Sequence, residues 1–252
     1  MPILTADELE RYDRQIMIED IGMHGQEKLK KARVFIAGAG GLGSPISLYL
    51  AAAGVGTIRI VDRDRVDLNN LNRQVLHRDD DIGEKKVDSA LTKLAGLNPS
   101  IHIETAWEII TEQNVSDLVA DADLVIDAMD NFPTRYLLNK AAIDRNIPFI
   151  HGAVSGFEGR VMTIIPGKTA CLRCMFRGPI PEEKFPVVGV TPAVIGSIQA
   201  TEAIKYIIGI GDLLGNRLLM FGGRPTLSAF LKSLEALVFF SDIALPPFQS
   251  WG

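Results

Sequence analysis

Residues that could bind a nucleotide lie close together in the first half of the 252-residue chain. The glycine turn Gly38-Ala39-Gly40-Gly41-Leu42-Gly43 stands between an apolar, β-branched run at 33–37 and a helical pattern at 44–53. Where side chains are absent, a phosphate can approach the backbone N–H groups, and the amino end of a helix adds positive potential. Asp62 follows the next apolar run, at 57–61, where a carboxylate can accept hydrogen bonds from a ribose. This unit is predicted to bind a nucleotide.

A second group of residues favours a triphosphate over a dinucleotide. Asn70 and Arg73 lie in the polar stretch after Asp62, Lys86 lies on the next predicted helix, and Asp130 follows a later strand. A triphosphate under attack needs cations that offset charge on the leaving pyrophosphate, which Arg73 and Lys86 could supply. It also needs a carboxylate to hold magnesium, and Asp130 suits that role. Each residue also has an ordinary interpretation: Arg73 as a solvated loop charge, Lys86 as an exposed helix residue and Asp130 as a helix cap.

The elements that must position these residues alternate along the chain. Apolar runs predict strands at 33–37, 57–61, 101–106, 123–127, 148–154, 159–165 and 217–221. Helical patterns, breakers and caps predict helices at 5–21, 26–31, 44–53, 81–97, 111–119, 131–146 and 193–208, the first of them with a capping box from Thr5 and Glu8. This alternation predicts an α/β fold, a Rossmann-like, doubly wound, mostly parallel sheet with a C-terminal extension. Ligands bind such sheets beyond the carboxyl ends of the strands, where the glycine turn, Asp62 and Asp130 all fall.

We expect a single domain over residues 1–252. Its predicted parts are N-terminal helices at 1–32, a nucleotide-binding core at 33–165, and a crossing loop, packing helix and tail at 166–252. The formal charge of −5, without a long basic run, argues against nucleic-acid binding. A charged N-terminus and the absence of an unbroken apolar span predict no signal peptide and no membrane segment, hence a cytoplasmic protein.

The motifs together identify a resemblance. From Arg11-Tyr12-Asp13-Arg14-Gln15 to 196–205, the chain resembles the ubiquitin-activating-type adenylyltransferases of the ThiF/MoeB/HesA group. The motifs that carry it include Asn70-Leu71-Asn72-Arg73-Gln74, Asp127-x-x-Asp130-Asn131 and Cys171-x-x-Cys174. The resemblance covers about 200 residues in the correct order, and the Arg73-Gln74 block after the glycine turn is its most specific part.

The resemblance implies ATP-dependent adenylation of the C-terminal glycine carboxylate of a small ubiquitin-like sulfur carrier (ThiS/MoaD-like) by a homodimer. By this similarity Asp62 would hold the ribose, Asn70, Arg73 and Lys86 the phosphates, and Asp130 a magnesium ion. Arg14, otherwise an ordinary surface charge, would reach the ATP of the partner subunit. The rest of the implied nucleotide site consists of Gly38, Gly40, Gly41, Gly43, Asp64, Gln74 and Asn131.

The chain departs from the family pattern in its cysteines. The crossing loop contains no cysteine from 176 to 190, which excludes a covalent step on a thiol there. Cys171 and Cys174 are the only cysteines, so a structural zinc site lacks two of its four ligands, and a pair of free thiols is the favoured interpretation. A redox pair is disfavoured because no helix start is predicted after them. The tail after Phe221 matches no family feature, which leaves both a lineage variant and an altered reading frame open.

Two other functions remain as alternatives. The glycine turn with Asp62 alone is typical of an NAD-dependent oxidoreductase, but that function leaves Arg73, Lys86 and Arg14 without a role. A degenerate family member that binds nucleotide or carrier without catalysis is the other alternative, because the loop thiol and the second cysteine pair are missing.

Overall fold

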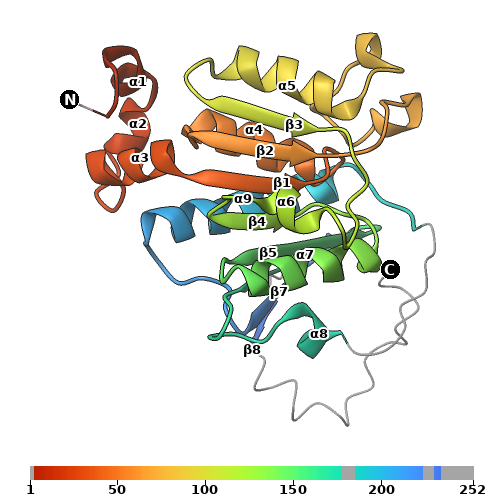
Figure 1. The fold of residues 1–252 in the computed structure, drawn as a ribbon. Helices are drawn as coiled ribbons and strands as arrows, with labels where there is room; N and C mark the ends of the chain where they lie inside the picture. The colour runs from red at the N-terminus through yellow and green to blue at the C-terminus, as the bar shows by residue number, and fades with distance from the viewer. Residues whose placement is uncertain (1–2, 177–184, 224–229, 234–252) are drawn as a thin grey trace.

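The computed structural model describes residues 3–176, 185–223 and 230–233. Within them the strands form one eight-stranded sheet in the order β3-β2-β1-β4-β5-β6-β7-β8 (Figure 1). The parallel part consists of β1 (Arg33–Ala37), β2 (Thr57–Val61), β3 (His102–Ala106), β4 (Leu124–Asp127) and β5 (Phe149–Ser155). This arrangement confirms the predicted Rossmann-like α/β fold with a mostly parallel sheet.

Helices cover both faces of the sheet (Figure 1). One face is covered by α4 (Gly43–Ala53), α5 (Lys86–Leu97) and α9 (Val190–Ile208), and the other by α6 (Val115–Val119) and α7 (Phe132–Asp144). Successive side chains of a strand point to opposite faces, so Val34 and Ile36 join one hydrophobic cluster, whereas Phe35 and Ala37 join the other. The central strands are therefore apolar on both sides, as expected for a sheet covered by helices.

The chain reverses its direction across the sheet between β1 and β4. It passes from β1 outward to β2 and β3, and then returns to pair β4 against the other side of β1. Such a switch point leaves a crevice at the carboxyl ends of the strands. The glycine turn follows β1 and Asp130 follows β4, so the topology places both beside the switch point.

Three short helices precede the sheet, namely α1 (Ala6–Arg11), α2 (Asp13–Ile16) and α3 (Gly22–Lys31). The capping box of Thr5 and Glu8 is confirmed. The prediction of one helix over 5–21, with a second from 26, is wrong in its boundaries. Gly25 lies inside α3, where a Cβ would approach Ile21 Cγ2 to 3.0 Å and Ile208 Cγ2 to 3.1 Å. Gly25 therefore serves close packing rather than breaking the helix.

The C-terminal part extends the sheet with antiparallel strands. These are β6 (Glu158–Ile164), β7 (Arg217–Gly222) and β8 (Phe230–Ser233), and the short helix α8 (Leu172–Met175) lies between β6 and α9. Most predicted elements occur within a few residues of their expected bounds. Two helices are shorter than predicted: α5 begins at Lys86 because Asp79–Asp81 forms a separate 3₁₀ turn, η2, and α6 begins at Val115. Another 3₁₀ turn, η1 (Leu68–Asn70), lies in the predicted ordered loop.

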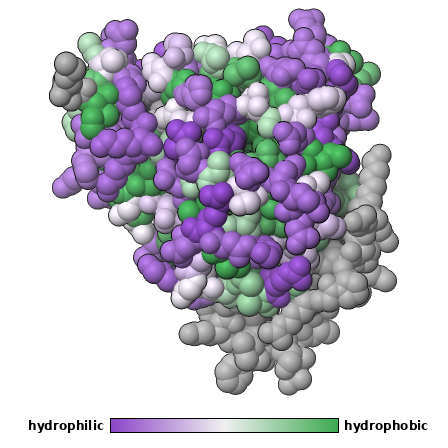
Figure 2. Space-filling view, in the orientation of Figure 1, coloured by the Kyte–Doolittle hydropathy of each residue, from purple (hydrophilic) through white to green (hydrophobic). Residues whose placement is uncertain are grey.

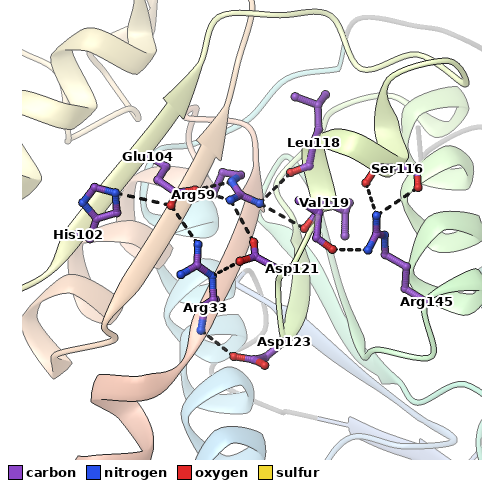
Figure 3. Close-up of polar contacts among 11 residues, drawn as sticks. Arg33, Arg59, His102, Glu104, Ser116, Leu118, Val119, Asp121, Asp123 and Arg145 are labelled. Atoms are coloured by element: carbon purple, nitrogen blue, oxygen red, sulfur yellow. Dashed lines mark hydrogen bonds and ion pairs between the residues drawn. The ribbon is translucent and has the colours of Figure 1, made fainter. Parts of the chain in front are cut away.

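Arginines secure the end of α6 against the sheet (Figure 3). Arg59 of β2 pairs with Glu104 of β3 and donates from Nη1 to the carbonyl oxygens of Leu118 and Val119, both at 3.4 Å. Arg145 donates to the carbonyl oxygens of Ser116 and Ala120. The last carbonyls of a helix have no partner within the helix, so these side chains satisfy groups that would otherwise need water.

The face of the molecule seen in Figure 2 is mostly hydrophilic, with apolar side chains in small, separate groups. Within the described parts of the chain, no helix is both long enough and apolar enough to cross a bilayer. The cytoplasmic location stays a prediction. Residues 234–252, most of the predicted tail, lie outside the described residues.

Candidate nucleotide site

The glycine turn is shaped by contacts that exclude larger side chains. Gly38 has a φ of 103°, and a Cβ there would lie 2.7 Å from the carbonyl oxygen of Ala128. A Cβ on Gly43 would lie 2.0 Å from the carbonyl oxygen of Gly38. The turn therefore passes tightly between the end of β1 and the loop after β4, and α4 begins directly after it. No side chain of the described residues caps the amino end of α4, which leaves its positive potential directed at the site.

Asp62 joins the glycine turn to the loop after β2. Its Oδ2 accepts a hydrogen bond from the backbone N–H of Ala39 at 2.8 Å, and its Oδ1 accepts one from Asp64 N at 2.8 Å. The Asp64 carboxylate in turn accepts from Lys86 Nζ at 2.9 Å. The side chain of Lys86 is only 6 % exposed, so the interpretation of Lys86 as an exposed helix residue is wrong. The buried Lys86 ammonium group is therefore linked through Asp64 to Asp62, the residue that holds the glycine turn.

Arg73 and Gln74 lie against the other side of the turn. A Cβ on Gly41 would be 3.6 Å from Arg73 Cγ, and a Cβ on Gly40 would be 3.6 Å from Gln74 Nε2. Arg73 is half-buried and donates from Nη1 to Asn69 O at 2.7 Å, a carbonyl oxygen of its own loop. The Oε1 atom of Gln74 is buried and has no hydrogen-bond partner among the described residues. A buried acceptor without a partner is costly, so this amide fits a ligand that supplies a donor.

Asn70 is buried, and its amide serves the local backbone. Its Oδ1 accepts from Asp67 N at 3.1 Å, and its Nδ2 donates to Asn69 Oδ1 at 2.7 Å. The carbonyl oxygen of Asn70 accepts from Gln74 N at 2.9 Å. Asn70 therefore shapes the loop that carries Gln74, and its predicted contact with phosphate stays a prediction.

Asp130 is exposed and is not the cap of the helix that follows it. Asn131 caps α7 instead, because its Oδ1 accepts from Thr134 N at 3.0 Å. Asp130 Oδ1 accepts only a 3.3 Å hydrogen bond from Asn131 Nδ2, and within the described residues it forms no ion pair. The helix-cap interpretation of Asp130 is therefore wrong, and its carboxylate is exposed in the loop after β4.

Two buried histidines near the site have no counterpart in the sequence prediction. His77 donates from Nε2 to the carbonyl oxygen of Ala39 at 2.9 Å, and its Nδ1 lies 2.8 Å from Ser89 Oγ. His151 Nδ1 lies 2.7 Å from Asp127 Oδ2. Burial lowers the pKa of His77 and lowers that of His151 to about 4, so both rings are neutral at pH 7.

Arg135 was also missed, although it is the largest fully buried side chain in the described parts of the chain. It forms an ion pair with Asp127, with Arg135 Nε 3.3 Å from Oδ2, and donates to the carbonyl oxygen of Met129 at 2.6 Å. A signal was available: Asp127 ends an otherwise apolar strand, where a charged residue needs a partner. The sequence does not indicate which of the many cations is that partner.

Arg14 lies at the opposite edge of the sheet. Its neighbour Gln15 donates to the carbonyl oxygen of Ala53 at the end of α4, and Arg11 donates to that of Leu97 at the end of α5. Both helices begin near the carboxyl edge and end at the amino edge, and the arrows of β1 to β3 point away from α1–α3 in Figure 1. The structure therefore brings the other predicted site residues to one edge but separates Arg14 from them.

The cysteine pair begins a short helix. Cys171 is the N-cap of α8, and its Sγ lies 3.3 Å from Cys174 Sγ. The premise that no helix starts after these cysteines is wrong. Burial alone would raise the pKa of Cys171, but hydrogen bonds from Cys174 and nearby backbone groups hold this pKa below its ordinary value. Among the described residues no group of three or more potential metal ligands exists, and zinc status stays a prediction.

This fold and site define a Rossmann-like nucleotide-binding protein. The glycine turn, the carboxylate after β2, two cations and the exposed carboxylate after β4 lie at the carboxyl ends of the strands, beside the switch point. The family model that describes the ThiF family matches residues 12–234, and the chain belongs to this family. The match continues beyond Phe221, so the family pattern extends further into the tail than expected.

Curated relatives are similar over most of the chain. The SAMP-activating enzyme E1 of Haloferax volcanii is 45% identical over 224 residues, which cover 86% of this chain and 83% of the relative. The sulfur carrier protein adenylyltransferase of Thermus thermophilus is 43% identical over 228 residues, 86% of this chain and 84% of the relative. Among solved structures, E. coli MccB with ATP has a TM-score of 0.80 at 25% identity, covering 88% of this chain and 71% of that one. PaaA has a TM-score of 0.82 at 27% identity, covering 92% and 75%.

Proposed function

We propose that this chain uses ATP to adenylate the C-terminal glycine carboxylate of a small ubiquitin-like sulfur carrier protein. The observation that supports the proposal most is the link of two cations to the glycine turn. Lys86 is joined to it through Asp64 and Asp62, and Arg73 lies beside Gly41, while Asp130 follows β4 at the same edge of the sheet. The names of the relatives in Haloferax volcanii and Thermus thermophilus, which describe an activating enzyme and a sulfur carrier adenylyltransferase, support the same reaction.

The reaction needs little from the protein beyond position and charge. A carboxylate is already a nucleophile, so no general base is required when the carrier carboxylate attacks the α-phosphate and pyrophosphate leaves. Holding the two reactants in line removes much of the entropic barrier. Arg73 and Lys86 offset the charge that develops on the leaving pyrophosphate, and Asp62 orients the ribose. These roles use side chains already ordered in the structure.

The residues fit magnesium bound together with a nucleotide. Magnesium sites of this kind use one or two carboxylates, with the other positions filled by phosphate oxygens and water. Asp130 offers one exposed carboxylate without a competing cation among the described residues. Asp130 would hold the ion, and magnesium would neutralise phosphate charge when bound.

We further propose a homodimer in which Arg14 completes the site of the partner subunit. The position of Arg14 supports this, because the residue is exposed at the amino edge, opposite its own glycine turn. Since the crossing loop contains no cysteine from 176 to 190, the acyl-adenylate would pass to an external sulfur donor or to another protein.

The test is ATP–pyrophosphate exchange with carriers that end in Gly-Gly. We expect exchange with the cognate carrier and none when its last glycine is removed. Replacing Asp130 with alanine should abolish exchange while thermal unfolding stays unchanged. Absence of exchange with every carrier that the folded protein binds would reject the proposal and support the non-catalytic alternative, in which carrier and ATP bind without reaction. Saturable NADH binding that ATP does not displace would support the oxidoreductase alternative.

A further inference from the structure

We propose that Asp127 and Arg135 form a buried pair of positioning residues that hold the Asp130 carboxylate in place for adenylation. The inference rests on the proposed function, because it concerns the residue assigned to the magnesium-bound nucleotide. The two side chains hold both polar backbone groups of Met129, the residue directly before Asp130. Asp127 Oδ1 accepts from Met129 N at 3.0 Å, and Arg135 Nη2 donates to Met129 O at 2.6 Å.

The pair is itself held rigidly. Arg135 and Asp127 are 1 % and 0 % exposed, and Arg135 Nε lies 3.3 Å from Asp127 Oδ2. His151 donates from Nδ1 to the same oxygen at 2.7 Å, because the neutral ring carries its proton there. The guanidinium also lies 5.0 Å from the ring centre of Phe132 and reaches the carbonyl oxygen of Gly152 at 3.3 Å. Both side chains are therefore fully buried and are contacted from β5 and α7.

The backbone around the pair is anchored on both sides. Ala128 N donates to Ala37 O of β1 at 2.9 Å, and Gln199 Nε2 of α9 donates to Asp127 O at 2.8 Å. Asn131 then begins α7 as its cap. Asp127, Ala128, Met129 and Asn131 therefore each have a side chain or backbone group held by a hydrogen bond, and the Asp130 carboxylate is left exposed.

Stability alone does not account for such a pair. The cost of removing two charges from water often equals or exceeds the gain from their attraction, so a buried ion pair is weak evidence for a stabilising role. A catalytic group misplaced by about 1 Å can cost about a hundredfold in rate. A rigid clamp on the residue before Asp130 provides that control of position.

The decisive variant is Arg135→Lys, which keeps a cation but has a single nitrogen. It cannot place one nitrogen beside Asp127 Oδ2 and a second one at the carbonyl oxygens of Met129 and Gly152, as Nε and Nη2 of Arg135 do. We expect kcat for ATP–pyrophosphate exchange to fall by about tenfold or more, with KM for the carrier within about twofold of the wild type. A binding measurement, which needs no turnover, accompanies this kinetic test. Magnesium should raise the affinity of the wild type for a non-hydrolysable ATP analogue, and this gain should be lost in Arg135→Lys, while affinity in EDTA stays unchanged.

A double-mutant cycle shows whether Arg135 acts through Asp130. If it does, Arg135→Lys costs no further activity in an Asp130→Asn background, whereas independent effects multiply. Arg59→Lys is the matched control, because Arg59 also joins a carboxylate to backbone carbonyls but lies in the α6 network (Figure 3). It should leave exchange and the magnesium effect unchanged.

The outcomes separate the two proposals. Wild-type protein without exchange rejects the proposed function, and the magnesium effect on analogue affinity still tests the clamp. Wild-type behaviour of Arg135→Lys, or losses that multiply in the double variant, overturns the clamp. If Arg135→Lys does not fold, Asp127→Asn takes its place, since it keeps the Oδ1 acceptor for Met129 while removing the charge that orients Arg135. Asp127→Asn is then expected to show the same fall in kcat and the same loss of the gain in analogue affinity that magnesium provides. If magnesium still raises the analogue affinity of that variant as it does in the wild type, the inference is overturned.

Discussion

The Asp62 carboxylate accepts a hydrogen bond from the backbone N–H of Ala39, with 2.8 Å between Oδ2 and the nitrogen. Ala39 lies in the glycine turn, and its carbonyl oxygen accepts from His77 Nε2 at 2.9 Å. Both polar groups of one peptide residue are therefore held by side chains from the segment after β2. Met129, at the other side of the switch point, is held in the same way by Asp127 and Arg135. The two loops that border the candidate site are thus each held through both backbone polar groups of one residue.

Replacing Asp62 with asparagine should weaken ATP binding. Asparagine keeps one acceptor but directs an NH₂ group at one of the two N–H donors, so a charge-assisted hydrogen bond worth about 1.5–3 kcal/mol is lost. We expect Kd for ATP to rise by about tenfold or more in calorimetric titration. Asp123→Asn is the control, because Asp123 also accepts a backbone N–H, that of Arg33 at 2.7 Å, but at the amino edge. An equal loss of affinity in both variants contradicts a specific role for Asp62.

Replacing Lys86 with methionine should slow adenylation without unfolding the protein. Methionine fills the same narrow space, and the Asp64 carboxylate that loses its partner is more than half exposed to water. Loss of one charged group that stabilises a transition state typically lowers kcat by about 10²–10³. The adjacent Lys85, whose Nζ lies 4.4 Å from the ring centre of Trp107, provides the matched control. Lys85→Met removes the same charge from the same helix start and should leave kcat for exchange within about threefold of the wild type.

Arg14 and Asp130 should complement each other across a dimer. If each site takes Arg14 from the partner subunit, Arg14→Ala and Asp130→Ala homodimers are both inactive. A mixed dimer contains one site with both residues intact and one site with neither, as expected for an interface with twofold symmetry. Equal mixing after dissociation should therefore restore about one quarter of wild-type exchange. If the mixture is no more active than the separate variants, Arg14 does not act in trans.

Acid should destabilise the protein through His151 before most carboxylates titrate. Its pKa is lowered from 6.5 to about 4 by burial, so the unfolded chain takes up a proton at a pH where the folded protein does not. The contribution of His151 to the free energy of unfolding is therefore fully present above pH 6.5 and is lost as the pH falls toward 4. The total loss is on the order of 3 kcal/mol. The free energy of unfolding in urea should fall between pH 7 and 4.5.

His151→Asn separates this contribution from the others. Its amide can donate to Asp127 in place of Nδ1–H but does not titrate, so the variant should lose less stability over the same pH range. Burial also lowers the pKa of His77, so His77 makes the free energy of unfolding fall with pH in both the wild type and the variant. Identical pH slopes for the variant and the wild type contradict the role of His151.

Local patterns were sufficient for most of the fold. The apolar runs at 33–37 and 57–61 became adjacent strands, and the glycines with Pro45 marked the start of α4. Helix ends were less predictable where tertiary packing opposed propensity. Glycine usually weakens a helix, yet α3 continues through Gly25. The absence of a side chain at this position lets Ile208 of α9 pack closely against α3.

The sequence by itself determined the order of strands and helices along the chain, the glycine turn and the family, because each is carried by residues that lie close together in the sequence. Only the tertiary structure decided which side chains hold which loops. Asp62 meets Ala39, Arg135 meets Met129, and Arg14 is separated from the site, through strand order and helix packing. Such pairings join segments whose separation along the chain carries no periodic signal, so no local pattern encodes them. The glycine turn indicates a nucleotide, and the contacts made across the sheet determine how the site around it is held.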